Sequence, residues 1–177
     1  ELDKHQVALL GIPEDSKAFI KGSREAPDKI RARLYQLSMI NQGLRIYDLG
    51  NIKNTGSVND TYYALRDVLL ELRERDMVTV LLGGSQDLCR GVFLALEKLE
   101  GLHHVLTIDS MLDFSVEESE FTSRNYLNQI LKPDCRTIFS YMNLGHQAYF
   151  VNDRQLQQLE STYLESIRLG DARKNMQ

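Results

Sequence analysis

Two short apolar segments, each ending abruptly in small and polar residues, constrain this chain more than any other feature. Residues 78–82 (Val-Thr-Val-Leu-Leu) are followed by Gly83-Gly84-Ser85-Gln86-Asp87. Residues 105–108 (Val-Leu-Thr-Ile) are followed by Asp109-Ser110-Met111-Leu112-Asp113. Such runs are typical of buried parallel strands, and open α/β sheets carry their sites beyond the carboxyl ends of these strands. The two polar segments are therefore where a functional site is expected.

Strand-like and helix-like segments alternate along the rest of the chain. A buried strand is predicted from Gln6 to Ile12, and a strong amphipathic helix is expected to be capped by Asn59-Asp60. This alternation predicts an α/β protein with a mostly parallel sheet covered by helices on both faces, a three-layer αβα architecture. The chain ends where another helix is expected, over 170–177, so the fold is predicted to be incomplete at its C-terminus. Further strands are expected over 45–49, 136–140 and 164–169, and further helices over about 26–41, 88–99, 123–131 and 153–159.

The size and charge of the chain limit the classes of function that it can have. Its 177 residues fit one domain, spanning 1–177, with enough length to bury a core. The 21 Lys and Arg residues against 25 Asp and Glu residues give a net charge of −4, which argues against a broad nucleic-acid surface. No run approaches the roughly 20 apolar residues of a membrane span, and no secretory leader is visible. Because Cys89 and Cys135 are expected to be reduced thiols, a cytoplasmic protein is expected.

Asp109 and Asp113 are the residues that point most directly to chemistry. Two carboxylates four positions apart at the end of a buried strand converge only where a cation compensates them. Gly83-Gly84 belongs to neither a G-x-G-x-x-G nor a G-x-x-x-x-G-K-[ST] pattern, so a dinucleotide or P-loop site is not expected. A tight turn that needs small residues explains these glycines.

The combination of motifs resembles the ureohydrolase family, which comprises arginase, agmatinase and formimidoylglutamase. That family carries Gly-Gly-Asp-His-Ser at one strand end, Asp-Ala-His-x-Asp at the next, and a later Asp-x-Asp. The matching segments here are 83–87 and 109–113. The resemblance covers nearly the whole chain, which in turn spans the N-terminal part of the family's domain. Flanking segments agree over 11–15, 22–31 and 48–51, and segments 141–147 and 168–170 resemble the formimidoylglutamase branch most.

The resemblance implies a chemistry and also shows where this chain departs from it. In the family, six side chains hold two Mn²⁺ ions whose bridging hydroxide attacks a guanidinium or formimino carbon. By position, Asp109 matches the bridging aspartate and Asp113 matches a carboxylate ligand of one metal. Gln86 stands where that metal has its histidine, and Met111 stands where the second metal has its own. Because a thioether suits Mn²⁺ poorly and an amide lacks the basicity of imidazole, a working binuclear site is not expected.

Three functions are compatible with these residues. The first is a catalytically silent protein of this family, a pseudoenzyme with little or no bound Mn²⁺, whose role is binding or assembly. The second is an active metal-dependent hydrolase of C–N bonds in linear amidines (formiminoglutamate, agmatine or arginine), which needs an Asp-x-Asp that would lie beyond Gln177. The third is a receiver-like module, for which Glu14 and Asp15 supply an acidic pair but no lysine follows at a later strand end. The expected partners are a small amidine or amino-acid-like ligand and further copies of the chain, with neither nucleic acid nor membrane.

Overall fold

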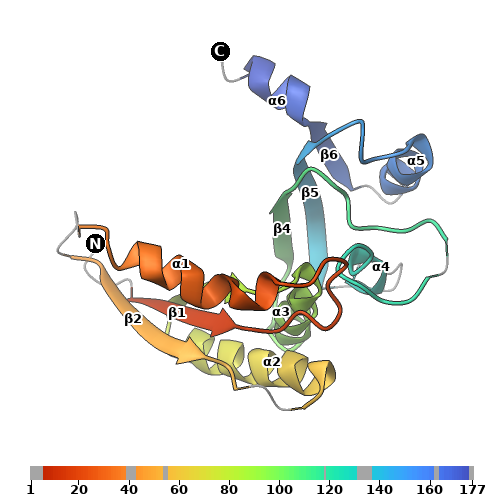
Figure 1. Cartoon of the computed structure of the whole chain (residues 1–177). Coiled ribbons are helices and arrows are strands. Elements are labelled where there is room, and N and C mark those ends of the chain that lie inside the picture. The colour runs from red at the N-terminus through yellow and green to blue at the C-terminus, as the bar shows by residue number, and fades with distance from the viewer. Residues whose placement is uncertain are drawn as a thin grey trace. The chain divides into compact units, whose positions relative to one another are not determined.

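All strand pairings in the described part of the chain are parallel (Figure 1). The computed structural model describes residues 6–38, 43–53, 56–117, 119–130, 137–161 and 164–175. The strands form two three-stranded sheets, and the chain divides into two compact units, Glu1–Leu99 and Glu100–Gln177. The predicted α/β class with parallel strands is confirmed, whereas one domain over 1–177 stays a prediction.

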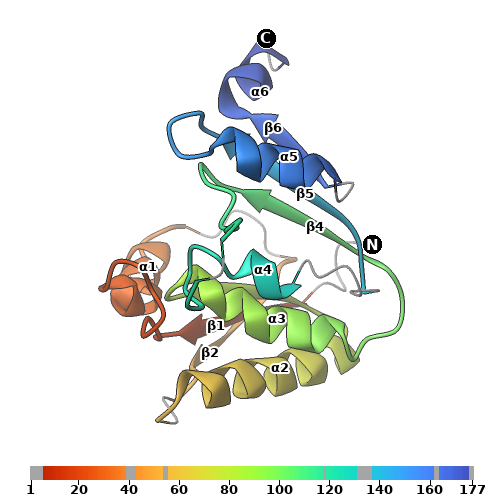
Figure 2. The same ribbon diagram turned by 90° about the vertical axis from the view of Figure 1, so that its right-hand side faces the viewer.

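The first unit is built on a sheet in the order β2-β1-β3. Its strands are β1 (Gln6–Ile12), β2 (Arg45–Asn51) and β3 (Met77–Gly83). Strand β2 lies on one side of β1 and β3 lies on the other. The chain therefore moves across the sheet in one direction from β1 to β2, and in the opposite direction from β2 to β3. Because parallel crossovers are right-handed, α1 (Ala26–Leu34) and α2 (Val58–Glu74) lie on opposite faces of the sheet (Figure 1). The third helix, α3 (Cys89–Leu96), packs beside α2 (Figure 2).

The central strand β1 carries the core of the first unit. Four of its apolar residues are at most 4% exposed, and α2 adds Tyr62 and Leu65 at 1% and 0%. By contrast, all seven residues of the edge strand β2 are exposed. The buried residues of β1 are Ala8, Leu9, Leu10 and Ile12.

Two helix boundaries in the first unit differ from the prediction. Ser57 caps α2, because its hydroxyl accepts the backbone N–H of Asp60 at 3.2 Å, and the expected cap at Asn59-Asp60 is wrong. The first helix, α1, ends at Leu34 instead of continuing to about residue 41. Residues 39–42, where that helix was expected to end, lie outside the described residues.

The second unit is built on a sheet in the order β4-β5-β6. Its strands are β4 (His103–Ile108), β5 (Ile138–His146) and β6 (Glu165–Arg168), and its helices are α4 (Leu127–Ile130), α5 (Asp153–Ser161) and α6 (Leu169–Asn175). The strand β5 is longer than predicted, and α4 is shorter than the expected helix over 123–131 (Figure 2). The core includes Leu112, Leu127, Tyr141 and Leu159, each at most 2% exposed.

No helix among the described residues is both long and apolar enough to cross a bilayer. Cys89, half-buried at the start of α3, forms no disulfide within the described ranges. Cys135, the other expected thiol, lies outside the described residues.

Candidate functional site

The turn that follows β3 is fastened to the end of β1. The Gly84 N–H donates to the Ile12 carbonyl at 2.9 Å, and the Ser85 N–H donates to the Glu14 carbonyl at 3.0 Å. A Cβ atom on Gly84 would lie 1.8 Å from the Glu14 carbonyl oxygen, so this close approach requires glycine. The predicted tight turn is confirmed at Gly84, whereas a Cβ on Gly83 would meet open space.

The two residues after this turn differ in exposure. Gln86, which the resemblance in sequence aligns with a histidine of the family, is exposed, whereas Asp87 is 0% exposed. The Tyr62 hydroxyl donates to one carboxylate oxygen of Asp87 at 2.5 Å, and the Ser85 hydroxyl donates to the other. Burial first, and the hydrogen bond to Asp87 second, raise the pKa of Tyr62. Asp87 therefore connects α2 to the turn through hydrogen bonds. This role was not predicted from the sequence, in which the nearby Ser85 is the one indication of it.

The turn that follows β4 is shaped by Asp109. One Asp109 carboxylate oxygen accepts the Met111 N–H at 2.9 Å and the Ser110 hydroxyl at 3.4 Å. The Asp109 N–H donates to the Leu144 carbonyl at 3.1 Å, which fixes the start of the turn to β5. Leu112, at 1% exposure, anchors the turn in the core of the second unit.

Asp113 ends this turn in an unusual state for a carboxyl group. It is 5% exposed, and its φ of 45° lies in the left-handed region, which aspartate tolerates better than most residues. Burial first, and the charge of Asp109 second, raise its pKa to about 7. The structure thus brings the two predicted carboxyls close enough to influence each other, and Asp113 takes up a proton near neutral pH.

The ligand atoms at this turn are poorly suited to manganese. Asp109 and Asp113 offer carboxylates, and Met111 offers a thioether where Mn²⁺ prefers an imidazole. Within the described ranges, no three His, Cys, Asp or Glu side chains gather as a metal cluster. His146 ends β5, and His103 lies at the opposite end of β4 from Asp109. The residues present therefore do not fit a binuclear Mn²⁺ centre.

Asn143 on β5 holds the same turn through its main chain. Its side-chain amide is 0% exposed and donates to the Met111 carbonyl at 3.0 Å and to the Thr107 hydroxyl at 3.2 Å. The Thr107 hydroxyl also bonds the Tyr141 hydroxyl at 2.8 Å, and burial raises the pKa of Tyr141 to about 12. The sequence analysis missed Asn143, whose only signal is a polar residue inside an apolar strand.

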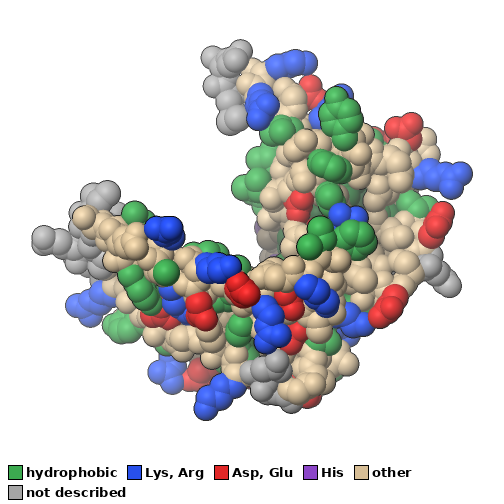
Figure 3. Space-filling view, viewed as in Figure 1, with side chains coloured by type: hydrophobic (Ala, Val, Ile, Leu, Met, Phe, Trp, Pro, Cys, Tyr) green, Lys and Arg blue, Asp and Glu red, His purple; other side chains and the backbone are tan. Residues whose placement is uncertain are grey.

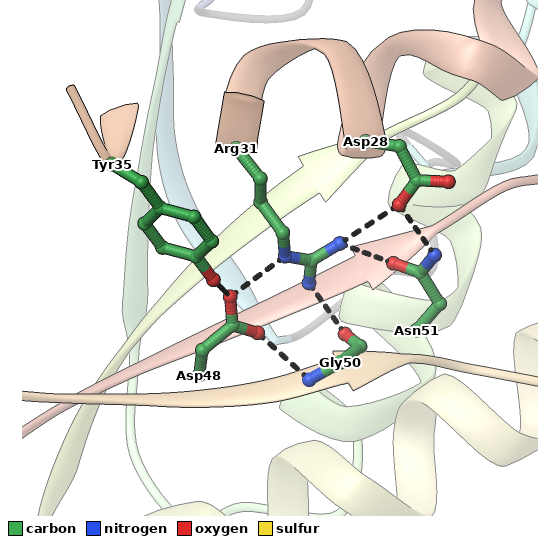
Figure 4. A network of polar contacts seen from close by, with 6 residues as sticks. All are labelled: Asp28, Arg31, Tyr35, Asp48, Gly50 and Asn51. Atoms are coloured by element: carbon green, nitrogen blue, oxygen red, sulfur yellow. Dashed lines mark hydrogen bonds and ion pairs between the residues drawn. The ribbon is translucent and has the colours of Figure 1, made fainter. Parts of the chain in front are cut away.

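A second polar network, centred on the buried Arg31, accounts for two of the segments that resemble the family. Arg31 on α1 is 8% exposed. It donates to the Asp48 carboxylate at 2.8 Å, to the Gly50 carbonyl at 2.6 Å and to Asn51 Oδ1 at 2.5 Å (Figure 4). The Tyr35 hydroxyl donates to the same Asp48 carboxylate. Arg31 therefore fastens α1 to the end of β2.

The network also perturbs Asp48 and restricts β1. Burial raises the pKa of Asp48, but the hydrogen bonds from Arg31, Tyr35 and Gly50 outweigh it and hold the pKa below its usual value. On the neighbouring strand, a Cβ atom on Gly11 would lie 1.9 Å from Asn51 Oδ1. These residues act as scaffold and not as an open site.

Glu14 and Asp15, the acidic pair on which the receiver-like interpretation rests, form hydrogen bonds within their own loop. Asp15 is 7% exposed, and its carboxylate accepts the Gly22 N–H at 2.7 Å and the Arg24 N–H at 3.3 Å. The Glu14 carboxylate accepts the Ser16 N–H at 2.6 Å. These contacts give Asp15 and Glu14 a structural role in shaping the loop.

Comparisons with known proteins agree with this architecture. The family model of the Arginase family matches residues 5–175. Formimidoylglutamase of Staphylococcus epidermidis is 31% identical over 151 residues, which are 81% of this chain and 48% of that protein. Formimidoylglutamase of Hahella chejuensis is 27% identical over an alignment that covers 93% of this chain and 55% of that protein. The chain thus spans about half the length of these curated relatives.

Solved structures share the fold. A structure of Trypanosoma cruzi formiminoglutamase with Mn²⁺ has a TM-score of 0.84 at 19% identity and covers 98% of this chain and 63% of its own. Arginase from Bacillus subtilis has a TM-score of 0.72 at 17% identity and covers 96% of this chain and 65% of its own. The family match extends over almost the whole chain and agrees with the parallel α/β fold. This chain belongs to the arginase family.

Proposed function

We propose that this chain is a non-catalytic member of the arginase family, which binds a small ligand without building a binuclear manganese centre. The observation that carries the proposal is the residue types at two turns, one after β3 in the first unit and one after β4 in the second. Asp109 and Asp113 keep the carboxylates, but Met111 presents a thioether at one histidine position and Gln86 an amide at the other. Neither replacement restores the basic nitrogen that a hard divalent metal would need there.

The two carboxyls suggest what could bind in place of metal. The ionised form of the buried Asp113 carboxyl is repelled by the half-buried Asp109 carboxylate, and either a proton or a cation relieves the repulsion. The raised pKa of Asp113 reflects the first solution. An amidinium or ammonium group of a small amino-acid-like ligand would supply the second. The binding role that we propose is for such a ligand.

Metal analysis tests the first part of this proposal. The whole protein is incubated with Mn²⁺, dialysed against metal-free buffer and measured by inductively coupled plasma mass spectrometry. We expect well below one Mn²⁺ per chain, because no imidazole stands at either histidine position. Two tightly held Mn²⁺ ions per chain would contradict the proposal.

A second candidate is an active hydrolase of linear amidines, and the names of the relatives favour it. The Staphylococcus epidermidis and Hahella chejuensis proteins are both formimidoylglutamases, although the chain covers only about half of each. The test is release of formamide from formiminoglutamate, or of urea from agmatine or arginine, by the whole protein with added Mn²⁺. Turnover that Asp109→Asn abolishes would replace the first proposal, whereas no turnover with any of the three substrates would end this one.

A further inference from the structure

The carboxyl ends of β5 and β6 border a pocket that the Asp109–Asp113 turn does not line. The last residues of these strands, His146 and Arg168, are paired across the sheet, and α6 begins at the next residue. The pocket has a volume of about 310 Å³ and lies entirely within the second unit. Because all three strands of this sheet are parallel, the pocket lies at the same sheet edge as Asp109.

The lining of this pocket carries an excess of positive charge. Three basic side chains line it, those of Arg168, Arg173 and Lys174, against the single carboxylate of Asp171. Lys174 Nζ lies 3.5 Å from the Asp171 carboxylate, so that pair is largely compensated. Neither arginine forms an ion pair within the part of the chain that the structure describes. Figure 3 shows Lys and Arg side chains gathered over α6 at the top of the view.

His146, a lining residue of the pocket, has a buried ring nitrogen to which no partner is assigned among the described residues. This nitrogen is Nδ1, and the residue as a whole is only 6% exposed. A buried polar atom left without a partner is unfavourable, so native structures usually provide one. Burial first, and the charge of Arg168 second, lower the pKa of His146, so the neutral ring has one N–H to donate.

We propose that this pocket binds the oxyanion group of a small ligand, a carboxylate or a phosphate. Arg168 and Arg173 would supply charge-assisted hydrogen bonds, for which the planar guanidinium fork is well suited, and the ring of His146 would lie beside the bound group. This inference does not depend on the binding role proposed for Asp109 and Asp113, because neither residue lines the pocket.

The pocket is nevertheless connected to the carboxylate turn. The Gln147 N–H, on its lining, donates to the Ser110 carbonyl at 2.9 Å. An anionic group bound beside Gln147 would therefore lie next to a segment that carries two carboxyls. Opposite charges on adjacent parts of one sheet edge suit a ligand that carries both an anionic and a cationic group.

Titration of the whole protein with two probes tests the proposal. Sodium phosphate and sodium L-glutamate are added separately at constant ionic strength, with sodium chloride as the reference, while the ring resonances of His146 are followed by NMR. We expect saturable shifts with at least one probe. Saturation by phosphate alone identifies a phosphate site, and saturation by glutamate alone identifies a carboxylate site. Shifts that are absent, or that chloride reproduces, would overturn the proposal.

Charge-removing variants on exposed side chains separate a specific site from general charge screening. Arg168→Gln and Arg173→Gln should each weaken binding of the effective probe about tenfold, since each removes a charge-assisted hydrogen bond. Arg154→Gln, on the exposed surface of α5, is the matched control and should bind as tightly as the parent protein. An equal loss of affinity for the probe in all three variants would show only general charge screening and would contradict the proposal. Circular dichroism verifies that each variant is folded.

Discussion

Asp113 shows how one residue can report on an altered site. Its burial and the neighbouring Asp109 carboxylate both disfavour its ionised form. A metal ion bound there would reverse this balance, because a divalent cation favours the ionised carboxylate. The protonation state of Asp113 is therefore a direct indicator of whether a cation is present at the turn.

The stability of the metal-free protein should depend on this one carboxyl. Because its pKa is raised from the ordinary 3.8 to about 7, the native state holds more protons than the unfolded state between these values. Stability is therefore expected to fall as pH rises through this window, by roughly 4 kcal/mol at most. Urea unfolding in chelator at about pH 5 and pH 8 measures the change.

Asp113→Asn is the matched control for this pH dependence, since it removes the titrating group and keeps its shape. The difference between the parent protein and the variant cancels contributions from other groups, including His146, whose lowered pKa acts in the opposite direction. A parent protein that loses no more stability than Asp113→Asn between the two pH values would refute the interpretation.

At the scale of elements, buried polar side chains fasten helices to the ends of strands. Tyr62 connects α2 to Asp87 after β3, and Arg31 connects α1 to Asp48 on β2. The first connection lies just after β3, and Arg31 also reaches Gly50 and Asn51 at the carboxyl end of β2. The turns are thereby held by the helices as well as by the sheet.

Tyr62→Phe should destabilise the protein through the Asp87 connection. The change removes one donor from a carboxylate that is 0% exposed, so we expect a loss of roughly 1–3 kcal/mol in the free energy of unfolding. Tyr63→Phe, at a tyrosine that is 48% exposed on the same helix, should change stability by less than about 0.5 kcal/mol. Equal effects of the two changes in denaturant unfolding would show that the buried bond contributes little.

Arg31→Lys should be costly although it keeps the positive charge. Lysine lacks the planar fork with which Arg31 reaches Asp48, Gly50 and Asn51 together, so we expect a loss of roughly 2 kcal/mol. Arg33→Lys, at an exposed position of the same helix, is the control and should be close to neutral. Thermal unfolding of both variants measures the change in stability. An Arg31→Lys variant as stable as the parent protein would contradict the role assigned to the network.

The elements were more predictable than the contacts between them. Strands such as β1 and β3 were predicted because β-branched and apolar runs mark parallel strands. The burial expected of both is confirmed for β1 but is wrong for β3, in which Leu82 is buried while Val78 and Val80 are exposed. The cap of α2 was misplaced because Ser57, Asn59 and Asp60 are all capable caps within one turn, and backbone geometry decides among them. Asp87 and Asn143 were missed because their roles depend on partners far away in the sequence, Tyr62 and Met111.

At the scale of the whole molecule, the chain carries the family's parallel α/β fold over about half of the length of its curated relatives. The family match covers residues 5–175. The α/β class could be predicted because strands and helices alternate over the entire chain. The division into two sheets could not, because strand order depends on pairings that no local pattern encodes.

Metal should have little effect on the stability of the parent protein. A ligand that binds only the native state raises the melting temperature, whereas an ion that does not bind leaves it unchanged. We therefore expect neither chelator nor added Mn²⁺ to shift thermal unfolding. The double change Gln86→His with Met111→His, in the whole protein, is expected to make the melting temperature rise with Mn²⁺. A rise of several degrees in the parent protein, or none in the double variant, would show that these positions are wrongly assigned.

The hydrogen bond from Asn143 to the backbone of residue 111 affects which substitutions this position can accept during evolution. The Asn143 side chain donates a hydrogen bond to the Met111 carbonyl, and the Asp109 carboxylate accepts one from the Met111 N–H. Because both bonds involve only the backbone of Met111, neither depends on the side chain at this position. A mutational scan should accordingly find position 111 permissive and position 112, whose leucine is 1% exposed, restrictive. A histidine could be lost from such a position, or regained, while the backbone around it stays in place.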